Sequence, residues 1–215
     1  VLLSAKGDVY DYFTKHGIQC VVKPFFYLWE KPKRLKTVLH HPTKSLYYQH
    51  WKIDRECVKH VKHVLNNKKI DIVHTNTTVV TIGINLSKAL KAKHVWHVRE
   101  YLDLDHGIEV FRGKKRLRRL INEADARIAI TNSVNRHWKL KTEFSYVISN
   151  AVRHETEVVY NRTKKKYFLF ASAFLTEKKG ASFAIRSFAK SKLAGKGYHL
   201  IMLGHCSAEY MQFLK

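Results

Sequence analysis

Apolar runs of strand length alternate along the chain with segments in which apolar residues recur every three or four positions. The runs predict strands at residues 18–26, 70–76, 94–98, 126–131, 146–152, 166–174 and 198–205. The periodic segments predict helices at residues 7–16, 52–66, 78–93, 112–124, from 132 onward and at 181–193. Strands that alternate with helices form parallel sheets, so we expect an α/β fold with a Rossmann-like parallel sheet and helices on both faces.

One polar stretch interrupts this alternation. Residues 153–166 carry few apolar side chains and end in three consecutive lysines, 164–166. A new strand pattern starts directly after them. We therefore expect a first domain at residues 1–155, a linker at 156–166 and the beginning of a second Rossmann-like domain at 167–215.

Polar side chains collect where two of the expected strands end. His74 and Asn76 close one strand, and His97, Arg99 and Glu100 close the next. Ligands of parallel α/β sheets bind beyond the carboxyl ends of the strands, so these residues are expected to line a site. Two alternatives stay open: Arg99 and Glu100 form a local ion pair, or Asn76 belongs to a helix cap.

Metal binding is not expected. His94 and His97 lie three apart on a strand and point to opposite faces, so His94 is expected to be a packing or rim histidine. The chain has no H-E-x-x-H or C-x-x-C pattern. Its three cysteines (20, 57 and 206) are an odd number without close spacing, which fits reduced thiols.

The charge of the chain is strongly positive. Forty Lys and Arg residues against seventeen Asp and Glu give a formal net charge of +23, which attracts polyanions. The densest cluster lies on the helix expected at 112–124, and we expect contact with anionic lipid from Lys114, Lys115, Arg116, Arg118 and Arg119. The alternative is a solvated helix face. A basic tract at 31–36, with aromatic residues at 47–51, would suit a membrane surface or single-stranded nucleic acid.

The segment TEKKG, residues 176–180, joins a strand to a helix in the second domain. We expect this junction to suit a phosphate group, because backbone N–H groups, the helix dipole and the Lys179 ammonium meet there just before Gly180. An ordinary turn is the alternative. The Walker sequence and the G-x-G-x-x-G fingerprint do not occur in the chain.

Taken in order, these segments resemble the retaining glycosyltransferases of family 4. Residues 70–100 resemble a part of the N-terminal domain in which a strand ending in a His-x-Asn-like element precedes a helix and a strand ending in His-x-Arg-Glu. Residues 126–133 and 146–152 resemble its later strands. Residues 168–190 and 199–205 resemble the opening of the nucleotide-sugar domain, so the resemblance covers most of the chain.

The resemblance implies a GT-B fold, with two Rossmann-like domains and a cleft between them. His97 would face the transferred sugar as the catalytic residue. Lys179 and Gly180 would hold the donor diphosphate without a metal or other cofactor, through positioned positive charge. The acceptor side of the cleft would be lined by His74, Asn76, Arg99 and Glu100.

The chain departs from the family pattern in three places. An Arg of the family falls here on Phe174, so one diphosphate contact is expected to be missing or displaced. The first strand with its Gly-rich loop would precede Val1, and the E-x7-E motif would follow Lys215. The residues of this chain alone are therefore expected to be inactive in sugar transfer.

The resulting hypothesis is a cytoplasmic glycosyltransferase bound peripherally to the inner face of the plasma membrane. It would transfer a sugar, with retention, from a nucleotide-sugar to a lipid-linked saccharide in bacterial capsular or exopolysaccharide synthesis. A UDP-sugar is expected, although the sequence does not separate UDP from GDP. The alternative is a nucleic-acid-binding α/β protein without catalysis, but no helix-turn-helix, RNP, KH or zinc signature occurs.

Overall fold

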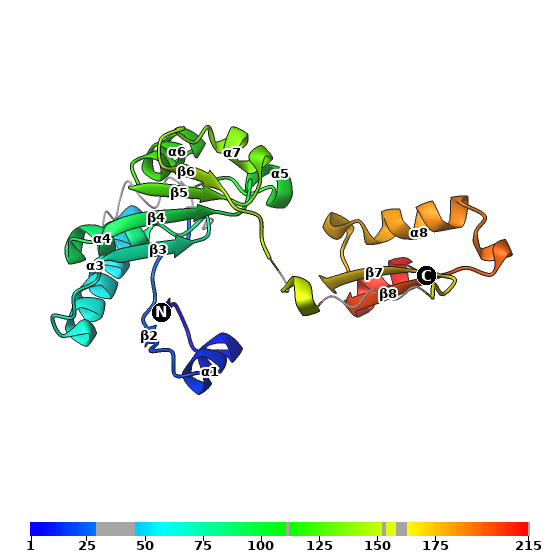
Figure 1. The fold of residues 1–215 in the computed structure, drawn as a ribbon, viewed down its shortest axis with the longest axis horizontal. Coiled ribbons are helices and arrows are strands. Elements are labelled where there is room, and N and C mark those ends of the chain that lie inside the picture. Colours follow the sequence, from blue (N-terminus) through cyan, green and yellow to red (C-terminus); the bar gives the residue numbers. More distant parts are fainter. Residues whose placement is uncertain (29–45, 111, 152–153, 158–162, 215) are drawn as a thin grey trace. The chain divides into compact units, whose positions relative to one another are not determined.

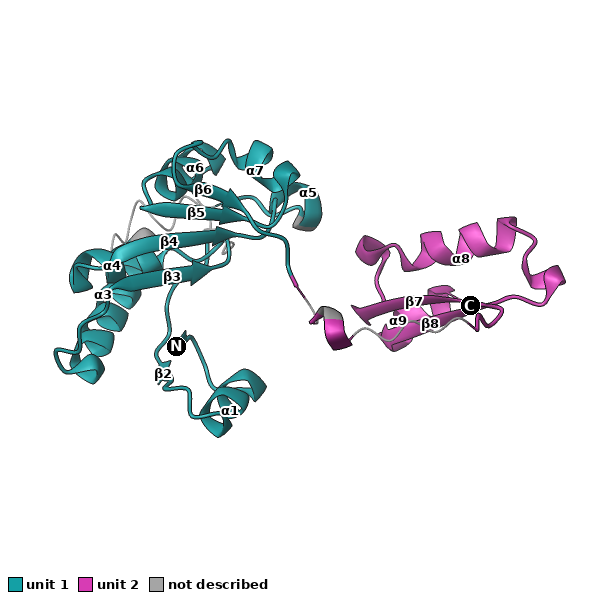
Figure 2. Cartoon of the chain, in the orientation of Figure 1, with its two compact units in different colours: residues 1–150 teal, residues 151–215 magenta. Residues whose placement is uncertain are grey.

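The computed structural model describes residues 1–28, 46–110, 112–151, 154–157 and 163–214 of the chain (Figure 1). The chain divides into two compact units, Val1–Asn150 and Ala151–Lys215 (Figure 2). The stretch expected as a linker falls within the first residues of the second unit. The basic tract expected at 31–36 lies outside the described residues.

A four-stranded parallel sheet forms the centre of the first unit, as the alternating pattern predicts. Its strands lie side by side in chain order: β3 (Ile72–Asn76), β4 (Lys93–Val98), β5 (Ala126–Ala129) and β6 (Ser145–Val147). Two shorter strands, β1 (Leu2–Leu3) and β2 (Val21–Val22), make a separate parallel pair. All the carboxyl ends of the larger sheet meet at one edge, so the loops that follow them are neighbours.

The described part of the first unit contains the helices α1 (Asp8–Lys15), α3 (Leu46–Leu65), α4 (Ile82–Leu90), α5 (Asp103–His106), α6 (Lys114–Asn122) and α7 (Asn132–Trp138). Helix α4 begins four residues later than its periodicity predicts. Val79 and Val80 are held outside the helix, because the Val79 carbonyl accepts the Leu28 N–H and Val80 bridges to Tyr27. Helix α3 starts six residues earlier than expected.

The core lies on one face of the sheet. In β4 the side chains of His94, Trp96 and Val98 are buried, whereas those of Val95 and His97 are only half-buried. Trp96 and Val98 belong to a hydrophobic core cluster that also includes Leu117 and Ile121 of α6 and residues of α4 and α7. Since alternate strand residues point to opposite faces, these helices cover the face that carries Trp96.

The opposite face of the sheet differs from the expectation of helices on both faces. Its side chains include Ile72, His74, Asn76 and Tyr146, all exposed, beside half-buried His97. Among the described residues, no side chains cover this face to the extent that they cover the face of Trp96. The polar residues predicted from the strand ends therefore stand on an open surface.

The second unit contains two parallel strands, β7 (Tyr167–Phe174) and β8 (His199–His205), joined by α8 (Ala181–Lys190). Helix α9 (Ala208–Leu214) follows β8, and short 3-10 turns occur at η2 (Glu155–Glu157), η3 (Glu177–Lys179) and η4 (Ala194–Lys196). Phe168 packs its ring against Phe188 of α8 and Tyr198. The strand–helix–strand order predicted for residues 166–205 is confirmed.

Helix α4 approaches the sheet of the first unit very closely at Gly83. Beneath it, Thr75 Oγ1 and His94 Nε2 form a buried hydrogen bond of 2.9 Å between β3 and β4. A Cβ atom on Gly83 would lie 1.9 Å from Thr75 Oγ1 and 2.9 Å from His94 Nε2. The absence of a side chain at this position lets the helix sit on the sheet, and His94 is a packing residue as expected.

We expect Gly83→Ala to destabilise the first unit by about 1–3 kcal/mol, the usual cost of overpacking a close-fitting core. The added methyl group must displace the Thr75 hydroxyl, and this outweighs the higher helix propensity of alanine. Denaturant unfolding measures the change. Gly7→Ala, at a position with no atom within 4 Å of the new Cβ, is the control and should cost less than about 1 kcal/mol.

The buried imidazole of His94 should make stability depend on pH. Burial lowers the pKa of His94 from 6.5 to about 4, partly offset by Asp125. Below about pH 6.5, His94 is protonated in the unfolded chain but stays neutral in the folded chain. The free energy of unfolding therefore falls as the pH drops from about 6.5 to about 4. The full loss is about 3 kcal/mol.

Unfolding free energies of the wild type and of His94→Gln, measured between pH 8 and pH 4, check this dependence. The variant has no titrating group at this position and should lose less stability over the same range. Parallel pH profiles for the two proteins would contradict the assignment.

Candidate functional site

The ends of β3 and β4 bring together four of the residues predicted for the site. Asn76 and His97 are paired across the two strands, and the rings of His74 and His97 stack with centroids 5.7 Å apart. The Arg99 guanidinium donates a 3.1 Å hydrogen bond from Nη1 to Asn76 Oδ1. Two histidines, an amide and a guanidinium therefore share one edge of the open sheet face.

His97 is the member of this cluster with unused hydrogen-bonding capacity. Its Nε2 atom is buried and has no hydrogen-bond partner among the described residues. Burial lowers the pKa of His97 below 6.5, and nearby Arg99 and His74 lower it further, against a smaller opposing effect of Glu100. The imidazole is therefore neutral near pH 7, and its Nε2 atom can form a hydrogen bond with an uncharged ligand group.

Glu100 has a different role from its neighbours. Its carboxylate accepts hydrogen bonds from the Thr78 amide (3.0 Å), the Thr78 hydroxyl (2.7 Å) and the Thr77 hydroxyl (3.2 Å). Arg99 is bound to Asn76 instead, so these two neighbours take separate partners. Glu100 thus ties the end of β4 to the turn after β3 and has little capacity left for a ligand.

Two tryptophans complete this connection. Trp138 of α7 donates from Nε1 to the Glu100 carbonyl (2.8 Å), and Trp96 donates to the Thr77 carbonyl (2.9 Å). Both tryptophan side chains are fully buried. Trp138 was not among the predicted site residues, because it lies 38 residues from Glu100 and no local pattern joins the two. The buried indoles hold rigid the turns that carry Arg99 and Asn76.

The histidine pair does not extend to a metal centre. Among the described residues, no group of three His, Cys, Asp or Glu side chains is close enough to hold a metal ion. The stacked arrangement of His74 and His97 places them to contact a ligand lying on the open face of the sheet.

The basic residues of α6 do not form one uniform surface. Lys115 and Arg119 are exposed, whereas Arg118 is half-buried. Arg119 lies 3.7 Å from Glu123, and Lys114 pairs with Asp103 at 2.7 Å. Lys114 also lies 5.6 Å from the centre of the Trp138 ring. The outward-facing side of α6 therefore carries fewer than the five residues predicted for membrane contact.

Arg116 differs from the other cations of α6, since it lines a cavity between α3, α4 and α6. In the part of the chain that the structure describes, no helix is both long enough and apolar enough to cross a bilayer.

The second unit contains the segment that the sequence predicts to be a phosphate cradle, residues 176–180. Gly180 ends η3 with φ of +82° and precedes α8, so it adopts the left-handed conformation that glycine favours. The side chain of Lys179 is exposed. Glu177 accepts hydrogen bonds from Ser182 and from the Tyr210 hydroxyl, and these, the Ser182 bond first, lower the pKa of Glu177. A carboxylate thus already lies at the start of α8.

A cavity of about 850 Å³ opens at the carboxyl ends of β7 and β8. It is lined by Phe174, Leu175, Thr176, Glu177, Lys178, His205, Cys206, Ser207 and Tyr210. Its size lies in the range of small-molecule sites, and its position is the one that parallel sheets use for ligands. Phe174, where the family has an arginine, forms part of the wall, while Lys179 and Gly180 lie outside the lining.

Substitutions of Glu100 and His97 should change the free energy of unfolding in different ways, because Glu100 holds the strand ends together and His97 has an unpartnered nitrogen. Glu100→Ala removes the acceptor of three hydrogen bonds and should cost about 2–3 kcal/mol of unfolding free energy. His97→Leu removes an unpartnered buried nitrogen and should leave stability unchanged or raise it by about 1 kcal/mol. Urea unfolding of both variants measures the difference. A large loss in His97→Leu would show that the ring is needed for packing.

The chain matches no protein-family model, and no curated protein matches its sequence. The described contacts establish a parallel α/β fold with polar residues gathered at strand ends.

Proposed function

We propose that this protein takes part in transferring a sugar from a nucleotide-sugar to an acceptor, with His97 at the reacting centre. The single observation that carries the proposal is the buried, unpartnered Nε2 atom of His97 at the carboxyl edge of a parallel sheet. The GT-B arrangement suggested by the motif order is part of the same proposal.

The chemistry of glycosyl transfer suits a neutral imidazole. The transition state of such reactions carries positive, oxocarbenium-like charge on the sugar. An imidazolium ion beside it would repel that charge, whereas neutral His97 can hydrogen-bond to a sugar hydroxyl without this cost. The lowered pKa of His97 supports this role, because it keeps the ring neutral at physiological pH.

The neighbouring groups would bind the acceptor. Arg99 uses one N–H on Asn76, and a guanidinium has further donors in its planar fork for a phosphate or carboxylate. His74 presents an exposed ring beside His97 that can pack against a saccharide. A lipid-linked saccharide, which joins a sugar to a phosphate, fits this pair of contacts.

The donor would use the second unit. Its cavity at the ends of β7 and β8 has room for part of a nucleotide-sugar, and Lys179 with the start of α8 would stabilise a departing diphosphate. Glu177 beside this position would accept ribose or sugar hydroxyls. The proposed donor is a UDP-sugar, and the proposed reaction uses protein cations in place of a metal ion.

The test is a transfer assay with protein expressed from the full coding sequence. Radiolabelled UDP- and GDP-sugars are supplied with lipid-linked saccharides from bacterial membranes, and product is separated by chromatography. We expect transfer from a UDP-sugar and a loss of at least about 100-fold in His97→Ala, as for removal of a group that acts in the transition state.

His199→Ala is the matched control, because His199 is an exposed histidine at the amino end of β8, the end opposite to the proposed donor half-site. It should transfer sugar at the wild-type rate. Equal rates for His97→Ala and wild type would reject the role of His97. Absence of transfer together with submicromolar, salt-sensitive binding of oligonucleotides would favour the nucleic-acid alternative, for which the net charge of +23 is the supporting observation.

A further inference from the structure

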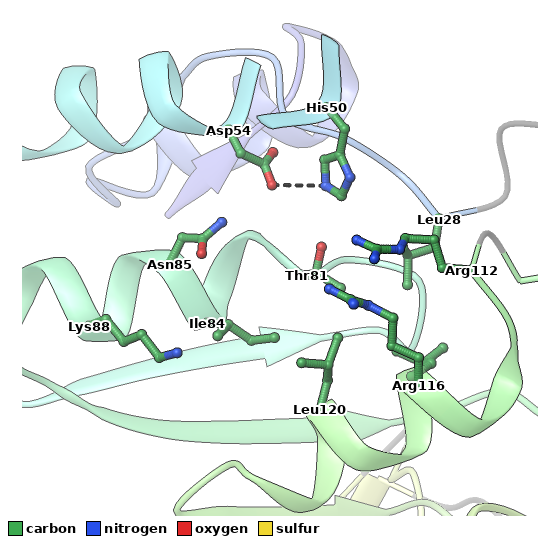
Figure 3. Close-up of a pocket in the computed structure, with 11 residues that line it drawn as sticks. Leu28, His50, Asp54, Thr81, Ile84, Asn85, Lys88, Arg112, Arg116 and Leu120 are labelled. Carbon is green, nitrogen blue, oxygen red and sulfur yellow. Dashed lines mark ion pairs between the residues drawn. The ribbon is translucent and has the colours of Figure 1, made fainter. Parts of the chain in front are cut away.

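A cavity of about 250 Å³ lies in the helical layer of the first unit, between α3, α4 and α6 (Figure 3). It is lined by Leu28, His50, Asp54, Thr81, Ile84, Asn85, Lys88, Arg112, Arg116, Leu117 and Leu120. The helices α4 and α6 cover the sheet face of Trp96, whereas His97 points to the other face. The cavity is therefore separate from the strand-end site.

Positive charge dominates the walls of this cavity. Figure 3 shows the guanidinium groups of Arg112 and Arg116 extending into it from one side, with the Lys88 ammonium on another. These cations come from α4, from α6 and from the residues just before α6. Among the described residues, no carboxylate lies within 4.0 Å of the charged groups of Arg116 or Lys88.

Asp54 is the acidic residue among the described residues that line the cavity, and its carboxylate already has other partners. Asp54 is only 3% exposed, and its Oδ1 accepts the Phe26 N–H at 3.1 Å. Its Oδ2 lies 3.1 Å from His50 Nε2, an ion pair marked in Figure 3. Asp54 therefore ties α3 to the backbone of Phe26 and offers little charge to offset Arg116.

Neutral donors and apolar walls complete the cavity. The Thr81 hydroxyl and the Asn85 amide lie between the cationic side and the His50–Asp54 pair. Beneath them, Leu117 is buried and Ile84 and Leu120 are half-buried. Cations beside an apolar floor are screened less than cations on a fully solvated surface, so their attraction for an anion is stronger.

A second hollow of about 550 Å³ adjoins the first and shares His50, Asp54, Asn85 and Arg116 with it. Along it, the α3 side chain of Trp51 is 48% exposed, and the Arg55 guanidinium lies 5.0 Å from the centre of its ring. Lys59 and Lys62 continue the same side. The groove thus adds an accessible aromatic surface and further cations to the cavity.

We propose that the cavity binds the phosphate group of an organic phosphate ester, with Arg116 and Lys88 as its anion-binding residues and Trp51 against the organic part. Guanidinium forks match phosphate oxygens in pairs, and the small cavity suits one phosphate group. The ester is either a soluble metabolite or the headgroup of a phospholipid. This site does not depend on the proposed sugar transfer.

The test uses the full chain and three probes: inorganic phosphate, glycerol 3-phosphate, and vesicles of phosphatidylglycerol in phosphatidylcholine. Calorimetry and tryptophan fluorescence measure binding at 150 mM salt. Arg116→Gln should weaken binding of the preferred probe at least tenfold. Lys115→Gln is the matched control, since it removes the same charge from an exposed neighbour on α6, and it should change binding less than twofold.

Preference for glycerol 3-phosphate identifies a soluble ester, and preference for the anionic vesicles identifies a lipid headgroup. Asn85→Leu narrows the cavity without changing charge and should weaken the same probe, with thermal unfolding confirming that each variant is folded. Equal losses in Arg116→Gln and Lys115→Gln would overturn the proposal, because binding would then follow net charge. Binding of none of the probes, or of single-stranded oligonucleotides alone, would overturn it as well.

Discussion

The hydrogen bonds of the Glu100 carboxylate hold together the part of the protein on which the strand-end site depends. They join the end of β4 to the Thr77–Thr78 turn, and the Glu100 carbonyl is fixed in turn by Trp138. Charge-assisted bonds to backbone and hydroxyl groups resist separation of the two strand ends. Arg99 immediately precedes this anchor, which is why its guanidinium can meet Asn76 in a defined geometry.

The contrast between Glu100 and His97 separates a structural group from a candidate functional one. Glu100 has its acceptors occupied by neighbours, while the buried Nε2 atom of His97 has no partner among the described residues. Folding gains nothing from an unpaired buried nitrogen, which is the reason for proposing that a ligand binds at His97. The same reasoning places His94 in the core, because its Nε2 is bonded to Thr75 beneath Gly83.

The cations that make up the net charge of +23 occupy different environments in the folded chain. Lys93 and Lys114 neutralise Asp125 and Asp103 and belong to local ion pairs. Lys115 is exposed on α6, whereas Arg116, one residue further, lines a cavity in the helical layer. Adjacent helix residues point about 100° apart, so a basic run divides between a solvated face and a cavity wall.

The sequence by itself determined the alternation of strands and helices, because hydrophobic periodicity is a local property. It also determined that polar residues would gather near His97, since parallel strands place their carboxyl ends at one edge. Gly17 directly follows the first predicted helix and has φ of +71°, the left-handed conformation in which helices commonly end. Each of these inferences needs only residues close together in the chain.

Tertiary structure alone decided the partners of the polar groups. Glu100 meets Trp138 across 38 residues, and Arg127, within an apparently apolar strand, is buried and donates to three backbone carbonyls and the Ser145 hydroxyl. The cavity between α3, α4 and α6 likewise needs three helices to meet. Such contacts depend on how whole helices and strands pack, and a local sequence pattern does not predict that packing.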